Sequence, residues 1–204
     1  MNTTGVSWKR FFPTATSGVH LFPEFETRAK AVSGEVFRVP DAAAARETLL
    51  RLVDEVGAKK AVVVESPIQE AAGITEALRL RGVTVYTEPT DIAAHAETAD
   101  IGISGVEFGV AETGSVFQDG TSIATRLVTI LPPLHVVFLP SANIVPGITE
   151  AFDIISPSFD RGYIGFITGP SRTADIERVL TIGVHGPGRF AIIAVDETPI
   201  GGAA

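Results

Sequence analysis

Residues 41–65, D-A-A-A-A-R-E-T-L-L-R-L-V-D-E-V-G-A-K-K-A-V-V-V-E, contain the pattern that decides the fold. Asp41 is a favourable N-cap, and the apolar residues after it recur at helical spacing until Gly57, which favours a helix C-terminus. The β-branched run in residues 60–65 predicts a short strand that is buried on both faces. The stretch is therefore expected to form a helix followed by a central strand.

The same alternation continues along the chain. Residues 68–80 are expected to form the next helix, which ends at Gly82, and residues 83–87 the next strand. Helices that alternate with short buried strands predict parallel pairing with right-handed crossovers. Further helices are predicted for 24–32, 91–98 and 148–152, and further strands for 35–39 and 135–139.

The pattern changes after residue 99. Residues 99–120 are rich in glycine and turn formers, which favours a β-rich part, whereas 121–130 fit a helix or a strand equally. We therefore expect an α/β fold, with an open, mainly parallel sheet flanked by helices and a β-rich part appended to it.

Composition limits the classes of protein that the chain can belong to. Its 204 residues, 45% apolar and 20% charged, predict a folded domain with a substantial core. The net charge of −8 argues against a broad nucleic-acid or anionic-membrane surface, and no apolar run reaches the roughly 20 residues of a membrane span. The chain contains no cysteine, which excludes disulfides and cysteine-ligated clusters within it. These features, without a leader-like N-terminus, favour a cytoplasmic location.

Two loops rich in glycine and proline gather polar side chains. T-G-P-S-R-T-A-D, residues 168–175, is expected to open a short helix whose free N–H groups attract an anion. G-V-H-G-P-G, residues 183–188, places His185 at the tip of a turn, where it can act as an acid or a base. The alternatives are a capped helix with internal ion pairs and an exposed histidine without a role. The candidate ligand-binding residues of the first loop are Gly169, Ser171, Arg172 and Thr173.

Two further positions have charged side chains of the kind that binds ligands. In A-E-T-G-S, residues 111–115, Glu112 is a candidate nucleophile or base, and Thr113 and Gly114 beside it are candidate ligand-binding residues. The alternative is that this motif is an ordinary hairpin turn. Arg126 interrupts an apolar segment, so it requires either a carboxylate partner or an anionic ligand. His135 is interpreted as a structural histidine. Because no histidine and acid set has metal-ligand spacing, no tightly held metal is expected.

Several of these motifs together resemble the LUD-domain family. The resemblance covers about residues 24–197, and it rests on A-E-T-G-S at 111–115, Arg126, L-P-P-L-H at 131–135, I-T-G-P-S-R-T-A-D-I-E at 167–177 and G-V-H-G-P at 183–187. It implies a fold similar to that of the NagB/RpiA/CoA-transferase group. The expected organisation is an irregular segment over 1–23, a single LUD domain over 24–197 and a flexible tail over 198–204.

The resemblance also implies a function. A LUD-domain protein of this kind is expected to be a cytoplasmic subunit of a system that oxidises L-lactate to pyruvate, in which partner subunits carry the iron–sulfur clusters and this chain holds no cofactor. It would bind a small anionic ligand, or a partner's cofactor, with Glu112 and His185 as catalytic candidates. The cleft would be lined by Thr113, Gly114, Arg126, Gly169, Ser171, Arg172 and Thr173. Two alternatives stay open: a stand-alone transferase or ligase-like enzyme acting on a CoA ester, phosphosugar or folate, and a non-catalytic binding module.

Overall fold

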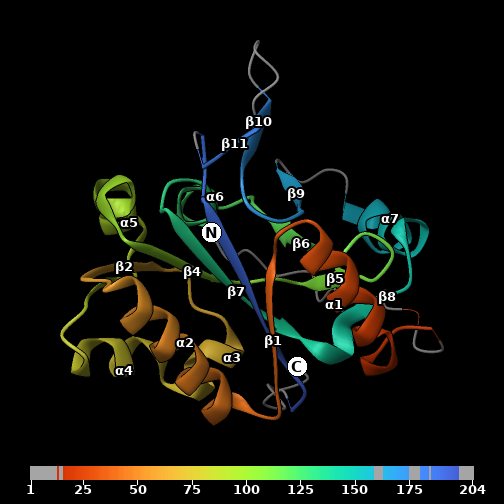
Figure 1. The fold of residues 1–204 in the computed structure, drawn as a ribbon, viewed down its shortest axis with the longest axis horizontal. Helices are drawn as coiled ribbons and strands as arrows, with labels where there is room; N and C mark the ends of the chain where they lie inside the picture. The colour runs from red at the N-terminus through yellow and green to blue at the C-terminus, as the bar shows by residue number, and fades with distance from the viewer. Residues whose placement is uncertain (1–12, 14–15, 159–162, 175–179, 184, 198–204) are drawn as a thin grey trace.

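A six-stranded parallel sheet forms the centre of the molecule (Figure 1). The computed structural model describes residues 13, 16–158, 163–174, 180–183 and 185–197. The strands of the sheet are hydrogen-bonded in the order β1-β12-β7-β4-β2-β3. Their bounds are β1 Glu35–Val39, β2 Lys60–Val63, β3 Thr84–Tyr86, β4 Ile101–Gly105, β7 Leu134–Pro140 and β12 Arg189–Val195.

A second sheet of four strands lies beside the first, in the order β8-β5-β6-β9. Its strands are β5 Phe108–Val110, β6 Ser115–Asp119, β8 Ile144–Val145 and β9 Ile164–Ile167. A separate hairpin of β10 (Arg172–Ala174) and β11 (Leu180–Ile182) projects from the molecule at the top of Figure 1. The parallel sheet with a β-rich addition confirms the predicted fold class.

Helices cover both faces of the parallel sheet. On one face, α2 (Ala42–Val56), α3 (Pro67–Ala72) and α4 (Ile74–Leu80) pack in one apolar cluster with alternate residues of the strands. The opposite face contacts α1 (Phe22–Ala31), α5 (Pro89–His95) and α6 (Ile123–Ile130), and α7 (Ile148–Ile155) covers the second sheet. Short 3-10 turns occur at Val19–Leu21, Ala96–Thr98, Ser141–Asn143 and Ser156–Ser158. No helix in the described part of the chain is both long and apolar enough to cross a bilayer.

The local signals of the sequence explain most of these elements. Asp41 caps α2 by accepting a hydrogen bond from Ala44 N at 2.8 Å, and Gly57 ends it with φ 62°. The prediction of one helix over 68–80 was wrong, because Gly73 adopts φ 61° and divides it into α3 and α4. The ambiguous stretch 121–130 contains helix α6. The predicted tail 198–204 and residues 1–12 lie outside the described residues.

Candidate functional site

Helix α6 approaches the parallel sheet closely at Gly102. A Cβ on Gly102 would lie 2.2 Å from Val128 O, so only glycine permits this contact. Beyond the helix, the chain turns through Pro133, whose carbonyl accepts a hydrogen bond from Arg189 N at 3.1 Å. Helix α6 is thereby held against the parallel sheet, with Arg126 partly exposed.

Arg126 lines a small hollow between α6 and the second sheet. The hollow has a volume of about 90 Å³, and its lining residues include Gln118, Thr129, Tyr163 and Phe166. The guanidinium carbon of Arg126 lies 5.1 Å from the centroid of the Tyr163 ring. Among the described residues, no carboxylate pairs with this half-buried guanidinium. Arg126 is therefore a cation that an anionic ligand can reach.

A chain of buried polar groups leads from this hollow into the parallel sheet. Thr129 Oγ1 donates to Gln118 Oε1 at 2.6 Å, which holds the amide in place. Gln118 Nε2 donates to Ser104 Oγ and to Gly105 O, both at 2.9 Å. Ser104 Oγ lies 2.9 Å from Nε2 of His135, which is fully buried. The hollow and the centre of the fold are thus linked by fixed hydrogen bonds.

His135 is held in its neutral form. Burial lowers the pKa of His135 from 6.5 to about 3, because the interior does not hydrate the charged ring. Its Nδ1 has no hydrogen-bond partner among the described residues, and its ring lies 5.5 Å from that of Phe190. This placement fits the structural role that the sequence suggested for it.

We expect the burial of His135 to make the folded state sensitive to acid. The unfolded chain protonates this ring near pH 6.5, whereas the folded chain protonates it only near pH 3, so stability falls as the pH drops below 6.5. The slope from this residue is at most about 1.4 kcal/mol per pH unit. Urea unfolding of the wild type and of His135→Gln between pH 7.5 and 4.5 measures it. The stability advantage of the wild type should shrink as the pH falls, and a difference that does not change with pH would contradict the expectation.

The loop that carries His185 lies next to the Arg126 hollow. His185 is exposed and lines a second hollow of about 580 Å³, which shares Ile130 with the first. Ser171 fixes this loop, since its N–H donates to Pro187 O at 2.8 Å and its carbonyl accepts from Gly183 N at 2.9 Å. The structure therefore brings Ser171 and His185 together and places them beside the Arg126 hollow.

The predicted helix after Pro170 was wrong. Residues Arg172–Ala174 form strand β10, in which Thr173 pairs with Thr181 of β11. Because the hairpin uses backbone groups that a helix start would leave free, it offers no helical N–H groups to an anion. Arg172 lies exposed at the base of the hairpin.

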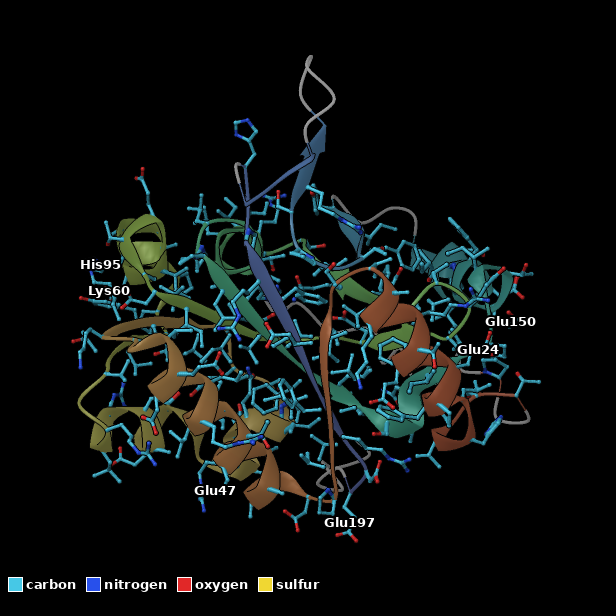
Figure 2. The ribbon with its side chains drawn as sticks, in the orientation of Figure 1. Glu24, Glu47, Lys60, His95, Glu150 and Glu197 are labelled. Atoms are coloured by element: carbon cyan, nitrogen blue, oxygen red, sulfur yellow. The ribbon has the colours of Figure 1, made fainter. Side chains whose placement is uncertain are left out.

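The A-E-T-G-S turn lies at the other end of β6 from Arg126. Strand β6 spans the five residues from Ser115 to Asp119, which corresponds to roughly 15 Å. Glu112 Oε2 accepts a hydrogen bond from Ile148 N at 3.0 Å, so it caps α7 together with Glu150, labelled in Figure 2. The single cleft expected from the sequence is thus not formed, because Glu112, Thr113 and Gly114 lie apart from Arg126.

Gly114 and Gly169 both accommodate the C-terminal part of α1 and the turn after it. Gly114 has φ 66°, and a Cβ there would lie 2.1 Å from Ala29 N. Gly169 has φ 76°, and a Cβ there would lie 2.2 Å from Val32 O. The sequence suggested that a ligand approaches these glycines, but the structure places the chain's own backbone against them.

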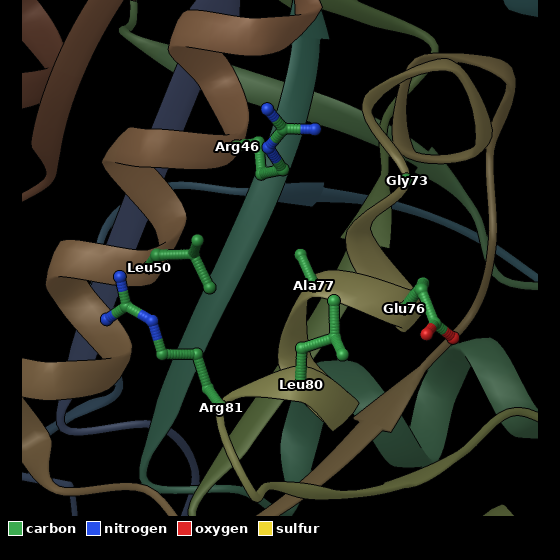
Figure 3. Close-up of a pocket in the computed structure, with 7 residues that line it drawn as sticks. All are labelled: Arg46, Leu50, Gly73, Glu76, Ala77, Leu80 and Arg81. Carbon is green, nitrogen blue, oxygen red and sulfur yellow. The ribbon is translucent and has the colours of Figure 1, made fainter.

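A third hollow lies on the other face of the parallel sheet, between α2 and α4 (Figure 3). It measures about 380 Å³ and is lined by Leu50, Ala77 and Leu80 with two arginines. Arg81 pairs with Asp54, and Arg46 Nη1 donates to Ala72 O at 3.4 Å. Both arginines contact oxygen atoms of the chain, whereas the described contact of Arg126 is with the Tyr163 ring, so this hollow is a weaker candidate for an anion site.

Sequence reasoning missed Gln118, Thr129 and Ser104. A glutamine after the apolar pair Val116-Phe117 was the one available signal, because a polar side chain in a buried strand requires partners. Its partners are 11 and 14 residues away in sequence, on different elements, and no local pattern connects them. Among the described residues, no group of three or more histidine, aspartate or glutamate side chains is placed to hold a metal ion.

The covered parallel sheet, the second sheet and the hollow at Arg126 define an α/β protein with a small cationic site. The sequence model of the LUD domain matches residues 22–195, and the chain belongs to this family.

The relatives agree with this membership. Lactate utilization protein C of Anoxybacillus flavithermus is 34% identical over 154 residues, which cover 74% of this chain and 70% of that protein. Lactate utilization protein C 1 of Bacillus mycoides is 32% identical over 161 residues, covering 74% and 69%. The crystal structure of a DUF162 family protein from Deinococcus radiodurans has the same fold, with a TM-score of 0.61 at 19% identity over 86% of this chain and 96% of that one.

Proposed function

We propose that this chain is a subunit of a lactate-oxidising system and that it binds a small anion at Arg126. The observation that carries the proposal is the half-buried guanidinium of Arg126, which lacks a carboxylate partner among the described residues. A partly desolvated charge without a partner costs free energy, and a bound anion offsets that cost. Relatives named for lactate utilization point to a carboxylate as the anion.

The subunit role follows from the chemistry of oxidation. Converting lactate to pyruvate releases two electrons, which need an acceptor, and a chain without cysteine cannot ligate an iron–sulfur cluster through thiolates. We assign the clusters to partner subunits in the cytoplasm. A partner that takes up electrons has to approach the ligand. Two exposed apolar side chains, Ile130 and Tyr163, line the hollow, and the exposed Ile123 and Leu131 lie at the two ends of α6.

Reconstitution tests this assignment. The purified chain and the iron–sulfur subunits of the system are assayed separately and together for dye reduction that depends on L-lactate. We expect activity only from the combination. Full activity of the isolated chain would show that it is a complete enzyme, and full activity of the partners without it would remove its role in the oxidation.

A further inference from the structure

The orientation of the Gln118 amide in the Arg126 hollow is fixed by its neighbours. Gly105 O can only accept a hydrogen bond, so the amide nitrogen of Gln118 has to face it. The second hydrogen of that nitrogen goes to Ser104 Oγ. The amide oxygen therefore faces Thr129 and accepts from it.

Thr129 consequently offers a ligand no hydrogen. Its Oγ1 lies 2.6 Å from Gln118 Oε1 and 2.8 Å from Thr125 O, and both of these oxygens are acceptors. A hydroxyl carries one hydrogen, which these two contacts use. Thr129 therefore presents to a molecule in the hollow a lone pair on its Oγ1, beside the cation of Arg126 and the ring of Tyr163.

The size of the hollow limits the ligand further. Its volume of about 90 Å³ equals that of roughly three water molecules in the liquid, which suits a short-chain carboxylic acid. A CoA ester, a folate or a dinucleotide is several times larger. Ile130, Phe166 and Ile167 supply apolar surface for a short alkyl group.

We propose that this hollow selects a short 2-hydroxycarboxylate over the corresponding 2-oxocarboxylate. The carboxylate pairs with Arg126, and the neighbouring hydroxyl donates to Thr129 Oγ1. A 2-oxo acid presents a carbonyl oxygen at the same position, so two acceptors face each other and neither regains the hydrogen bond that it made with water. The inference rests on the proposed anion site, and it makes Thr129 the residue that distinguishes the reduced acid from the oxidised product.

Ligand titrations of the purified chain test the selectivity. L-lactate, pyruvate and propionate, which lacks the hydroxyl, are compared by calorimetry and ligand-observed NMR. We expect L-lactate to bind about tenfold more tightly than pyruvate. Thr129→Val removes the acceptor, so L-lactate should weaken about tenfold, to the level of propionate, while pyruvate changes far less. Thr129→Ser keeps the hydroxyl and should retain the preference, and thermal unfolding of each variant verifies that it is folded.

The outcomes separate this inference from the proposed function. Equal affinities for L-lactate and pyruvate, both lost in Arg126→Gln, would overturn the selectivity and leave the anion site in place. A preference that survives in Thr129→Val would overturn the role of Thr129. No binding of any of the three acids, or binding that Arg126→Gln leaves unchanged, would overturn the anion site and the selectivity with it.

Discussion

Replacing Gly114 with alanine is expected to destabilise the protein by about 2–5 kcal/mol. Gly114 has φ 66°, a conformation that costs an L-residue about 1–2 kcal/mol. The added Cβ would also lie 2.1 Å from Ala29 N and 2.5 Å from Arg28 C, which are backbone atoms of α1. Because α1 has to move away from the second sheet, overpacking adds about 1–3 kcal/mol.

Gly57→Ala is the matched control for this substitution. Gly57 has a similar φ of 62°, but nothing lies within 4 Å of its Cβ position. The Gly57→Ala variant should therefore lose only about 1–2 kcal/mol of stability, from backbone conformation alone. Urea unfolding of both variants measures the difference. Equal losses of stability in the two variants would mean that the close approach of α1 is not the reason why position 114 requires glycine.

Arg126→Gln is expected to weaken the binding of short carboxylates by about 10- to 150-fold. Glutamine keeps a polar side chain but removes the charge, and hydrogen bonds to charged groups contribute about 1.5–3 kcal/mol. The free energy of unfolding should change by at most about 1 kcal/mol, because the substitution removes a contact with the Tyr163 ring but no ion pair within the described residues. Calorimetric titration with L-lactate and urea unfolding of the variant measure the two effects.

Arg51→Gln is the control for the charge at 126. Arg51 also lies over an aromatic ring, with its guanidinium carbon 5.9 Å from the centroid of Phe37, but it belongs to α2 on the opposite face of the sheet. This substitution should leave carboxylate binding unchanged. If Arg126→Gln instead lowers stability and not affinity, Arg126 is a structural residue.

The predictable part of the fold is the part whose signals are local. In α2, Asp41, the apolar repeat and Gly57 all lie within the element that they define, so its bounds follow from the sequence. Gly73 was not recognised as a break, because a lone glycine within a helical pattern is often tolerated. Residues 172–174 became a strand through pairing with 180–182, a contact that a reading limited to neighbouring residues does not detect.

In the candidate site, too, the features with local sequence signals were predictable and the features that depend on tertiary contacts were not. The sequence left two alternatives for Arg126, a carboxylate partner or an anionic ligand, and only the geometry shows that its described neighbour is the Tyr163 ring and not a carboxylate. Gly114 looks the same in a sequence whether a ligand or a helix approaches its backbone, and here the helix does. The orientation of Gln118 depends on Gly105 O and Thr129, which tertiary folding brings together.

A crystal structure of the protein grown with saturating L-lactate tests the binding site most directly. The expected map contains one lactate in the hollow of α6, with its carboxylate within hydrogen-bonding distance of the Arg126 guanidinium and its hydroxyl on Thr129 Oγ1. Lactate bound instead at the carboxyl ends of β2 and β4, where open parallel sheets commonly hold ligands, or only solvent beside Arg126, would contradict this account.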